Sequence, residues 1–155
     1  MKSTYSPREL VELLQTKGYR ASFECPEVGT NAIESGSSGF EWSLDFAQAE
    51  IDEQVDSARF LYFIRVNPSN FPVGKICNDT NLNGHVGVAQ FIFPDLDDEE
   101  KNVLLVFDHE MWFSGGVSTE WISNQLHQWD VAMCAFNECI SANEEEILED
   151  DVSFD

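Results

Sequence analysis

Basic residues are scarce in this sequence. Its 155 residues include 8 Lys and Arg against 29 Asp and Glu, and no Lys or Arg follows Lys101. The formal net charge is therefore −21 at pH 7. A chain this acidic repels phosphate backbones, which argues against direct nucleic-acid binding and favours basic partners. The simpler explanation is that many of these acidic side chains only keep the protein surface hydrated.

Long apolar runs and paired cysteines are also absent. No run approaches the roughly 20 apolar residues that span a bilayer, and "MKSTYSPREL" lacks the apolar core of a signal peptide. We therefore expect a cytoplasmic protein that does not contact membranes. Cys25, Cys77, Cys134 and Cys139 contain no C-x-x-C pair and have no His at metal-ligand spacing. They are predicted to be reduced and buried, without a disulfide or a zinc site.

Recognisable catalytic motifs are missing as well. Asp108, His109 and Glu110 are adjacent, but on a strand His109 points away from the face that the two carboxylates share. Ser114 in "FSGGVS" has no nucleophile elbow around it, and a turn explains the two glycines. The sequence therefore predicts a protein that is not an enzyme and needs no cofactor and no metal.

The stretch "DTNLNGHVGVAQ" (79–90) is similar to a calcium-binding loop at its start. Asp79, Asn81 and Asn83 fall at positions 1, 3 and 5 of the EF-hand pattern, followed by Gly84 at position 6. Position 12 is Gln90 instead of a bidentate Glu, and an apolar, strand-like run stands where a second helix is required. A helix that ends near Asn83, with Gly84 as its left-handed cap, explains the stretch better. We expect no specific effect of calcium.

Hydrophobic periodicity predicts a mixed fold. A hydrophobic content of 43% with 12 Phe is enough for the core of one domain. A capping box from Ser6 to Glu9 starts a first helix that Gly18 ends. The later candidates are short strands at 20–25 and 31–35, strands at 39–46 and 59–66, a helix at 72–83, strands at 85–93 and 102–113, and a helix capped by Ser118. The predicted order α-β-β-β-α-β-β-α, which has one strand fewer before the middle helix than there are candidates, indicates an α+β fold with a single antiparallel sheet and N-terminal, middle and C-terminal helices.

The last helix and the tail differ in composition. The apolar residues of the helix step by 4, 3, 4, 3 and 4 positions and are predicted to face the core: Ile122, Leu126, Trp129, Met133, Phe136 and Ile140. The tail 143–155 holds seven acids and no base. We therefore expect a single domain over 1–142 and a tail over 143–155 that is disordered or loosely docked and dispensable for folding.

Several segments resemble the YbjN family, described as bacterial sensory transduction regulators, whose fold is similar to that of type III secretion chaperones. The segments are "LVELLQTKGYRAS", "AIESGSSGFEWSLDF", "FLYFIRVN", "CNDTNLNGHVGVAQFIF" and "VLLVFDHEMWFSGGVSTEWISNQL". In the family pattern the middle helix ends in spaced asparagines, which Asn78, Asn81 and Asn83 match. The resemblance covers residues 8 to 140 and implies a non-enzymatic regulator or a chaperone-like adaptor. The acidic segment 94–101 and the tail are outside what the resemblance explains.

A candidate binding surface follows from the alternation of residues along the strands. The apolar face of 59–66 is assigned to the core: Phe60, Tyr62, Ile64 and Val66. The other face, together with the 102–113 strand, predicts an exposed partner-binding patch: Leu61, Phe63, Arg65 and Trp112. The partner would be a protein or peptide, with basic ones favoured, or a second copy of this chain. The competing expectation is that a helix or the tail covers these residues.

Two other functions agree with parts of the sequence. The charge alone is compatible with an acidic DNA mimic that inhibits a nucleic-acid-binding protein, and the many carboxylates alone with a divalent-metal-dependent hydrolase. The prediction that uses most of the sequence is a non-enzymatic regulator or chaperone-like adaptor that binds another protein.

Overall fold

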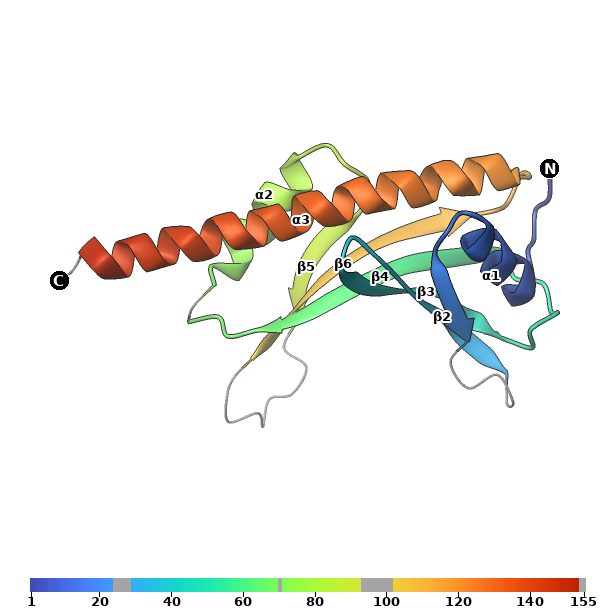
Figure 1. Ribbon diagram of the computed structural model, residues 1–155, viewed down its shortest axis with the longest axis horizontal. Coiled ribbons are helices and arrows are strands. Elements are labelled where there is room, and N and C mark those ends of the chain that lie inside the picture. Colours follow the sequence, from blue (N-terminus) through green and yellow to red (C-terminus); the bar gives the residue numbers. More distant parts are fainter. Residues whose placement is uncertain (24–28, 70, 93–101, 154–155) are drawn as a thin grey trace. The chain divides into compact units, whose positions relative to one another are not determined.

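The computed structural model describes residues 1–23, 29–69, 71–92 and 102–153, and side chains as far as residue 144 (Figure 1). The elements are α1 (Pro7–Thr16), β1 (Arg20–Phe23), β2 (Thr30–Ser37), β3 (Phe40–Ala49), β4 (Ser57–Val66), α2 (Val73–Leu82), β5 (Val88–Ile92), β6 (Val103–Trp112) and α3 (Thr119–Ser153). The α+β fold is confirmed, with four strands before α2 where the predicted order has three. Both short candidates, at 20–25 and 31–35, form strands.

The six strands form one antiparallel sheet in the order β1-β2-β3-β4-β6-β5. The first four strands are neighbours in sequence and in space, and β6 lies between β4 and β5. The pairing register sets which side chains meet on one face of the sheet, because neighbouring Cα partners project to the same side. In β3 and β4, Asp45 is the partner of Arg59 and Leu44 is the partner of Phe60.

The chain divides into two compact units. Unit 1 contains residues 1–62 and 108–130, and unit 2 contains residues 63–107 and 131–155. The two long strands β4 and β6 and the helix α3 each contribute residues to both units. The expectation of a single domain over 1–142 stays a prediction.

In unit 1, local sequence signals place the first helix as expected. The Ser6 hydroxyl accepts a hydrogen bond from the Glu9 backbone N–H, and the Glu9 carboxylate accepts one from the Ser6 backbone N–H. Tyr5 and Leu10, on either side of this capping box, are both buried. Gly18 follows the helix with a φ of +89°, a left-handed conformation that suits glycine. The start and the stop of α1 are therefore encoded locally.

Three aromatic rings form the centre of unit 1. Trp129 of α3 stacks on Phe60 of β4 with 5.2 Å between ring centroids, and Trp42 of β3 meets Phe60 and Trp129 edge-on. Trp129 and Phe60 are completely buried. The Ser118 hydroxyl accepts a hydrogen bond from the Trp121 backbone N–H, so Ser118 caps α3 as predicted. Together these contacts confirm that the stripe of α3 faces the core.

Unit 2 contains the asparagine-rich stretch and the second half of α3. The helix α2 ends at Leu82, and Gly84 has a φ of +76°, as the predicted left-handed cap requires. The Asn81 side chain donates to the Ala89 carbonyl at 3.0 Å and accepts from the Ala89 N–H at 2.8 Å. These two hydrogen bonds join the end of α2 to β5. The Asn81 amide oxygen, which the calcium-loop pattern would place on an ion, therefore accepts from the backbone.

The helix α3 ends later than predicted. It continues to Ser153 instead of stopping near Ala142. Asn143, the first residue of the expected tail, is buried, and its amide donates to the Cys139 carbonyl at 2.7 Å. Glu and Leu have high helix propensities, so the acidic composition that suggested disorder is also compatible with a continued helix. The expectation that residues 143–155 form a disordered or loosely docked tail stays a prediction.

Three of the four cysteines are among the residues that the structure describes. Cys77 is buried, and burial raises the pKa of its thiol. Cys134 and Cys139 are half-buried, and all three of these cysteines are free. Cys25 and the acidic segment 94–101 lie outside the described residues.

Candidate partner-binding surfaces

In unit 1, α1 and α3 pack on one face of the sheet, and we call the opposite face the outer face. Buried residues of β4, among them Ala58 and Phe60, point to the helices, whereas Arg59 is exposed and Leu61 is half-buried on the outer face. On β6, Glu110 and Trp112 are exposed on the outer face. Antiparallel sheets commonly keep one face in water, and there the side chains are usually polar. Trp112, which is 57% exposed, departs from that rule.

A row of charges crosses the outer face of unit 1. Asp45 on β3 is the register partner of Arg59 on β4, and Arg59 forms an ion pair with Asp108 on β6 at 3.6 Å. The carboxylate of Glu110, two residues along β6, has no hydrogen bond or ion pair within the part of the chain that the structure describes. Arg59 therefore neutralises part of the row, and Glu110 keeps its charge available to a partner.

His109 points to the other side, as the alternation of β6 predicts. Its Nε2 lies 2.7 Å from the Gln125 Oε1 on α3, and its ring stacks parallel to Phe60 with 6.1 Å between centroids. The two neighbouring carboxylates, Asp108 and Glu110, stay on the outer face. The three adjacent residues therefore do not form one acid–base group.

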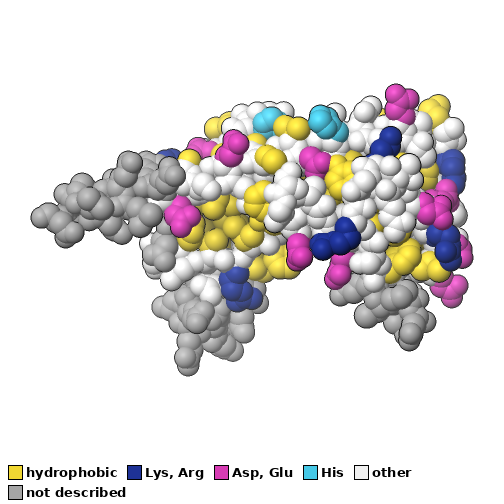
Figure 2. All heavy atoms as spheres, viewed as in Figure 1, with side chains coloured by type: hydrophobic (Ala, Val, Ile, Leu, Met, Phe, Trp, Pro, Cys, Tyr) yellow, Lys and Arg dark blue, Asp and Glu magenta, His cyan; other side chains and the backbone are white. Residues whose placement is uncertain are grey.

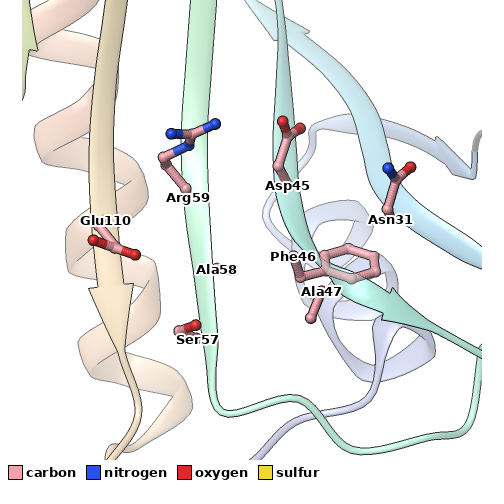
Figure 3. Close-up of a pocket in the computed structure, with 8 residues that line it drawn as sticks. All are labelled: Asn31, Asp45, Phe46, Ala47, Ser57, Ala58, Arg59 and Glu110. Atoms are coloured by element: carbon pink, nitrogen blue, oxygen red, sulfur yellow. The ribbon is translucent and has the colours of Figure 1, made fainter.

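Two adjoining hollows lie in unit 1. The first, of about 320 Å³, opens between residues of β2, β3, β4 and β6: Asn31, Asp45, Phe46, Ala47, Ser57, Ala58, Arg59 and Glu110 (Figure 3). The second, of about 350 Å³, shares Ala47 and Ser57 with the first. The side chains of Ala47 and Ser57 are small, so they project little from the sheet and leave space above it. We call these two adjoining hollows together the unit 1 groove.

Trp112 stands next to this groove. The Phe113 N–H donates to the Asp56 carbonyl at 2.9 Å, which aligns the end of β6 with the start of β4. Trp112 therefore lies at the level of Ser57, which is part of the groove floor. The stacking of His109 on Phe60 places Leu61 near the level of Asp108.

This register sets the spacing of two of the predicted contact residues. Leu61 and Trp112 belong to unit 1, but about four residues of strand separate their levels, roughly 13 Å. The charged residues Arg59, Asp108 and Glu110 occupy the outer face between them. Within unit 1, Leu61 and Trp112 therefore do not make one continuous apolar patch. The sequence shows which residues share a face, but the distance between them depends on the pairing of β4 with β6.

The other two predicted residues, Phe63 and Arg65, belong to unit 2. Phe63 is 57% exposed and Arg65 is also exposed. Unit 2 has further large apolar side chains in contact with solvent that the sequence reading did not single out: Leu82, Val88, Phe91, Ile92 and Val131. Three of these belong to β5, the last strand in the sheet order. An apolar run in the sequence does not reveal whether its strand is central or at an edge.

A chain of polar side chains, also missed from the sequence, holds α3 within unit 1. The Tyr19 hydroxyl and the Ser37 hydroxyl both donate to the Asp130 carboxylate, and the Trp42 indole N–H donates to the Ser37 hydroxyl at 2.9 Å. Burial, followed by the hydrogen bond to Asp130, raises the pKa of the Tyr19 hydroxyl well above its ordinary value. Tyr19 and Asp130 are 111 positions apart, so no local pattern indicates their contact.

Metal and membrane sites were also considered. Within the described ranges, no three His, Cys, Asp or Glu side chains come together in a way that could hold a metal ion. None of the helices in the same ranges combines the length and the apolar character needed to cross a membrane. On the face shown in Figure 2, Asp and Glu side chains are dispersed among apolar and uncharged ones.

The comparisons with known proteins support the fold. No protein-family model and no curated protein matches the sequence. The crystal structure of YbjN from E. coli, a proposed transcription regulator, matches with a TM-score of 0.64 and 16% identity, over 88% of this chain and 90% of that one. An uncharacterized protein from Methanothermobacter thermautotrophicus matches with a TM-score of 0.56 and 14% identity, over 89% and 98% of the two chains. The chain has a YbjN-like fold.

Proposed function

We propose that this protein, which has the fold of a proposed regulator, is a non-enzymatic cytoplasmic regulator or chaperone-like adaptor that acts by binding another protein. The fold is compatible with such a role, and fold alone does not define a function. The proposal therefore depends on the surface. Leu61, Phe63, Arg65 and Trp112 remain the proposed contact residues, now as separate positions instead of one patch.

One observation carries the proposal. Phe63 and Trp112 are each 57% exposed, although they belong to β4 and β6, which are interior strands of the sheet. The residues beside Trp112 on its strand, Met111 and Phe113, are almost completely buried, so the strand itself is well packed. An exposed aromatic residue on an ordered sheet is a candidate contact for a partner, because Trp is among the residues enriched at the sites that contribute most binding energy.

The test uses immobilised full-length protein and an extract of the native cell. Proteins retained by the wild type are identified, purified, and titrated against the wild type, Trp112→Ala, Phe63→Ala and Val131→Ala. Val131 is a matched control because it is an exposed apolar residue on α3. We expect Trp112→Ala or Phe63→Ala to weaken binding by about 2 kcal/mol and Val131→Ala to leave it within about 0.5 kcal/mol.

The proposal fails if every retained protein binds both aromatic variants as tightly as it binds the wild type. Sedimentation of the same four proteins covers the case of a second copy. A dimer that Trp112→Ala or Phe63→Ala dissociates would show that the exposed aromatic residues serve self-association.

A further inference from the structure

We propose that the unit 1 groove binds an extended, basic segment of the partner protein, with a Lys or Arg side chain held between Glu110 and the Trp112 ring. This inference rests on the proposed function, because it names the chemistry of the partner. It adds a defined position, a defined side-chain class and a defined backbone form to the general statement that the protein binds another protein.

The shape of the groove favours an extended segment. The two hollows share Ala47 and Ser57, so they adjoin, and together their lining residues extend from Asn31 and Glu110 to Thr4 and Gln54. Each hollow has a volume of about 320–350 Å³, which is sufficient for a few side chains but not for a folded element. A peptide in extended form projects alternate side chains to one side and can therefore fill two neighbouring hollows.

The charges of the groove favour a basic occupant. Among the described residues that line the two hollows, Arg59 is the only base, and it already pairs with Asp108. The acids that line the same hollows are Asp45, Glu53, Asp56 and Glu110. Asp45 accepts a hydrogen bond from the Ser43 hydroxyl at 2.7 Å, whereas Glu110 has no such partner in the described ranges. An incoming cation would restore the balance of charge at Glu110.

Glu110 and Trp112 together define where the cation binds. They are two residues apart on β6 and therefore project to the same face, roughly 7 Å apart along the strand. A cation between them can contact the carboxylate and, at the same time, the face of the indole ring. A neutral side chain gains neither contact, so the pair should select Lys and Arg over Gln of similar length.

The probe is a short fluorescent peptide of alternating Arg and Ala, compared with peptides that carry Gln or Glu in place of Arg. Binding is measured by fluorescence anisotropy at low and at physiological ionic strength. The proteins are the wild type, Glu110→Gln, Trp112→Ala and the control Glu12→Gln. Glu12 is an exposed acid on α1, on the side of the sheet away from the groove, and its substitution removes the same charge. Thermal melts establish that all variants are folded.

We expect the Arg peptide to bind, the Gln and Glu peptides not to bind measurably, and Glu110→Gln and Trp112→Ala each to weaken binding about tenfold. Glu12→Gln should change the affinity less than about twofold, because long-range attraction is screened by salt. Equal losses in Glu110→Gln and Glu12→Gln would show only non-specific attraction to an acidic protein and would overturn the inference. Absence of binding of the Arg peptide to the wild type would do the same.

The two failures are distinguishable. If a cellular protein is retained in a Trp112-dependent manner and the Arg peptide does not bind, the proposed function holds and the basic segment is wrong. If the Arg peptide binds at Glu110 and Trp112 but no cellular protein depends on either aromatic residue, the groove is a peptide site and the proposed function is wrong.

Discussion

Units 1 and 2 present different kinds of surface. In the described part of unit 1 the large apolar side chains in solvent are Met1 and Trp112, whereas in unit 2 they are Phe63, Leu82, Val88, Phe91, Ile92 and Val131. Unit 1 instead offers a groove with a row of charges. The net charge of −21 therefore does not describe one uniform surface. A basic partner segment is favoured at the groove of unit 1, and apolar contacts through Phe63 are favoured at unit 2.

The units also differ in how their parts are joined. In unit 1 the carboxylate of Asp130 accepts from two side chains on two other elements of the chain. In unit 2 the clearest polar link is between the neighbouring elements α2 and β5, through Asn81 and Ala89. Long-range polar contacts hold a fold in one arrangement more strictly than apolar packing does. We therefore expect substitutions of polar residues to cost more stability in unit 1 than in unit 2.

The largest expected effect comes from the buried aromatic residues of each unit. Trp129→Ala removes the ring that stacks on Phe60, and Phe136→Ala removes the ring that stacks on Phe107 at 4.9 Å. Both residues are completely buried, so each change should lower the free energy of unfolding by about 3–5 kcal/mol. Calorimetry shows whether the units unfold together. In a single domain both variants lower the midpoint of one shared transition, and two transitions, each lowered by only one variant, would contradict that expectation.

The next effect concerns the polar chain of unit 1. Asp130→Ala leaves the Tyr19 and Ser37 hydroxyls without their acceptor and should destabilise the protein by about 1–3 kcal/mol. Tyr19→Phe removes only one of the two hydrogen bonds and should cost about 1 kcal/mol. Urea unfolding of both variants gives the comparison. Equal stabilities of the wild type and Asp130→Ala would mean that the chain of hydrogen bonds does not stabilise unit 1.

A smaller effect is expected at the corresponding link in unit 2. Asn81→Ala removes both hydrogen bonds to Ala89, but Asn81 is exposed, so water can replace part of what is lost. We expect a loss of about 1 kcal/mol or less, together with faster amide hydrogen exchange at Ala89. Asn78→Ala is the control from the same helix. If Asn81→Ala proves more destabilising than Asp130→Ala, the proposed difference between the units is reversed.

The smallest effect is expected from the end of α3. Removal of residues 145–155 takes away mostly acidic residues and should lower the melting temperature by only a few degrees, the change produced by about 1 kcal/mol. Truncation after Ala142 also removes Asn143, which is buried, and should cost more. A decrease of more than roughly 8 °C for the shorter truncation would show that the end of the helix is docked.

Helix boundaries that depend on local signals were predicted well. The Ser6–Glu9 capping box, the Gly84 cap and the Ser118 cap are all present, because each involves atoms only a few residues apart in the chain. The α+β fold also follows from the order and periodicity of the apolar segments, and its YbjN-like character was implied by the resemblance of five segments to that family. The helix α3 continues to Ser153, and an acidic composition does not decide between a helix and a disordered chain.

The sequence by itself determined which residues share a face of each strand, since side chains alternate strictly along an extended backbone. It therefore placed Phe60 in the core and left Phe63 and Trp112 exposed. Only the tertiary structure decided how the strands align with one another. That alignment separates Leu61 from Trp112, sets Asp45 beside Arg59, and opens the groove over Ala47 and Ser57. Register and long-range contacts depend on atoms far apart in the chain, so no single segment contains the information that determines them.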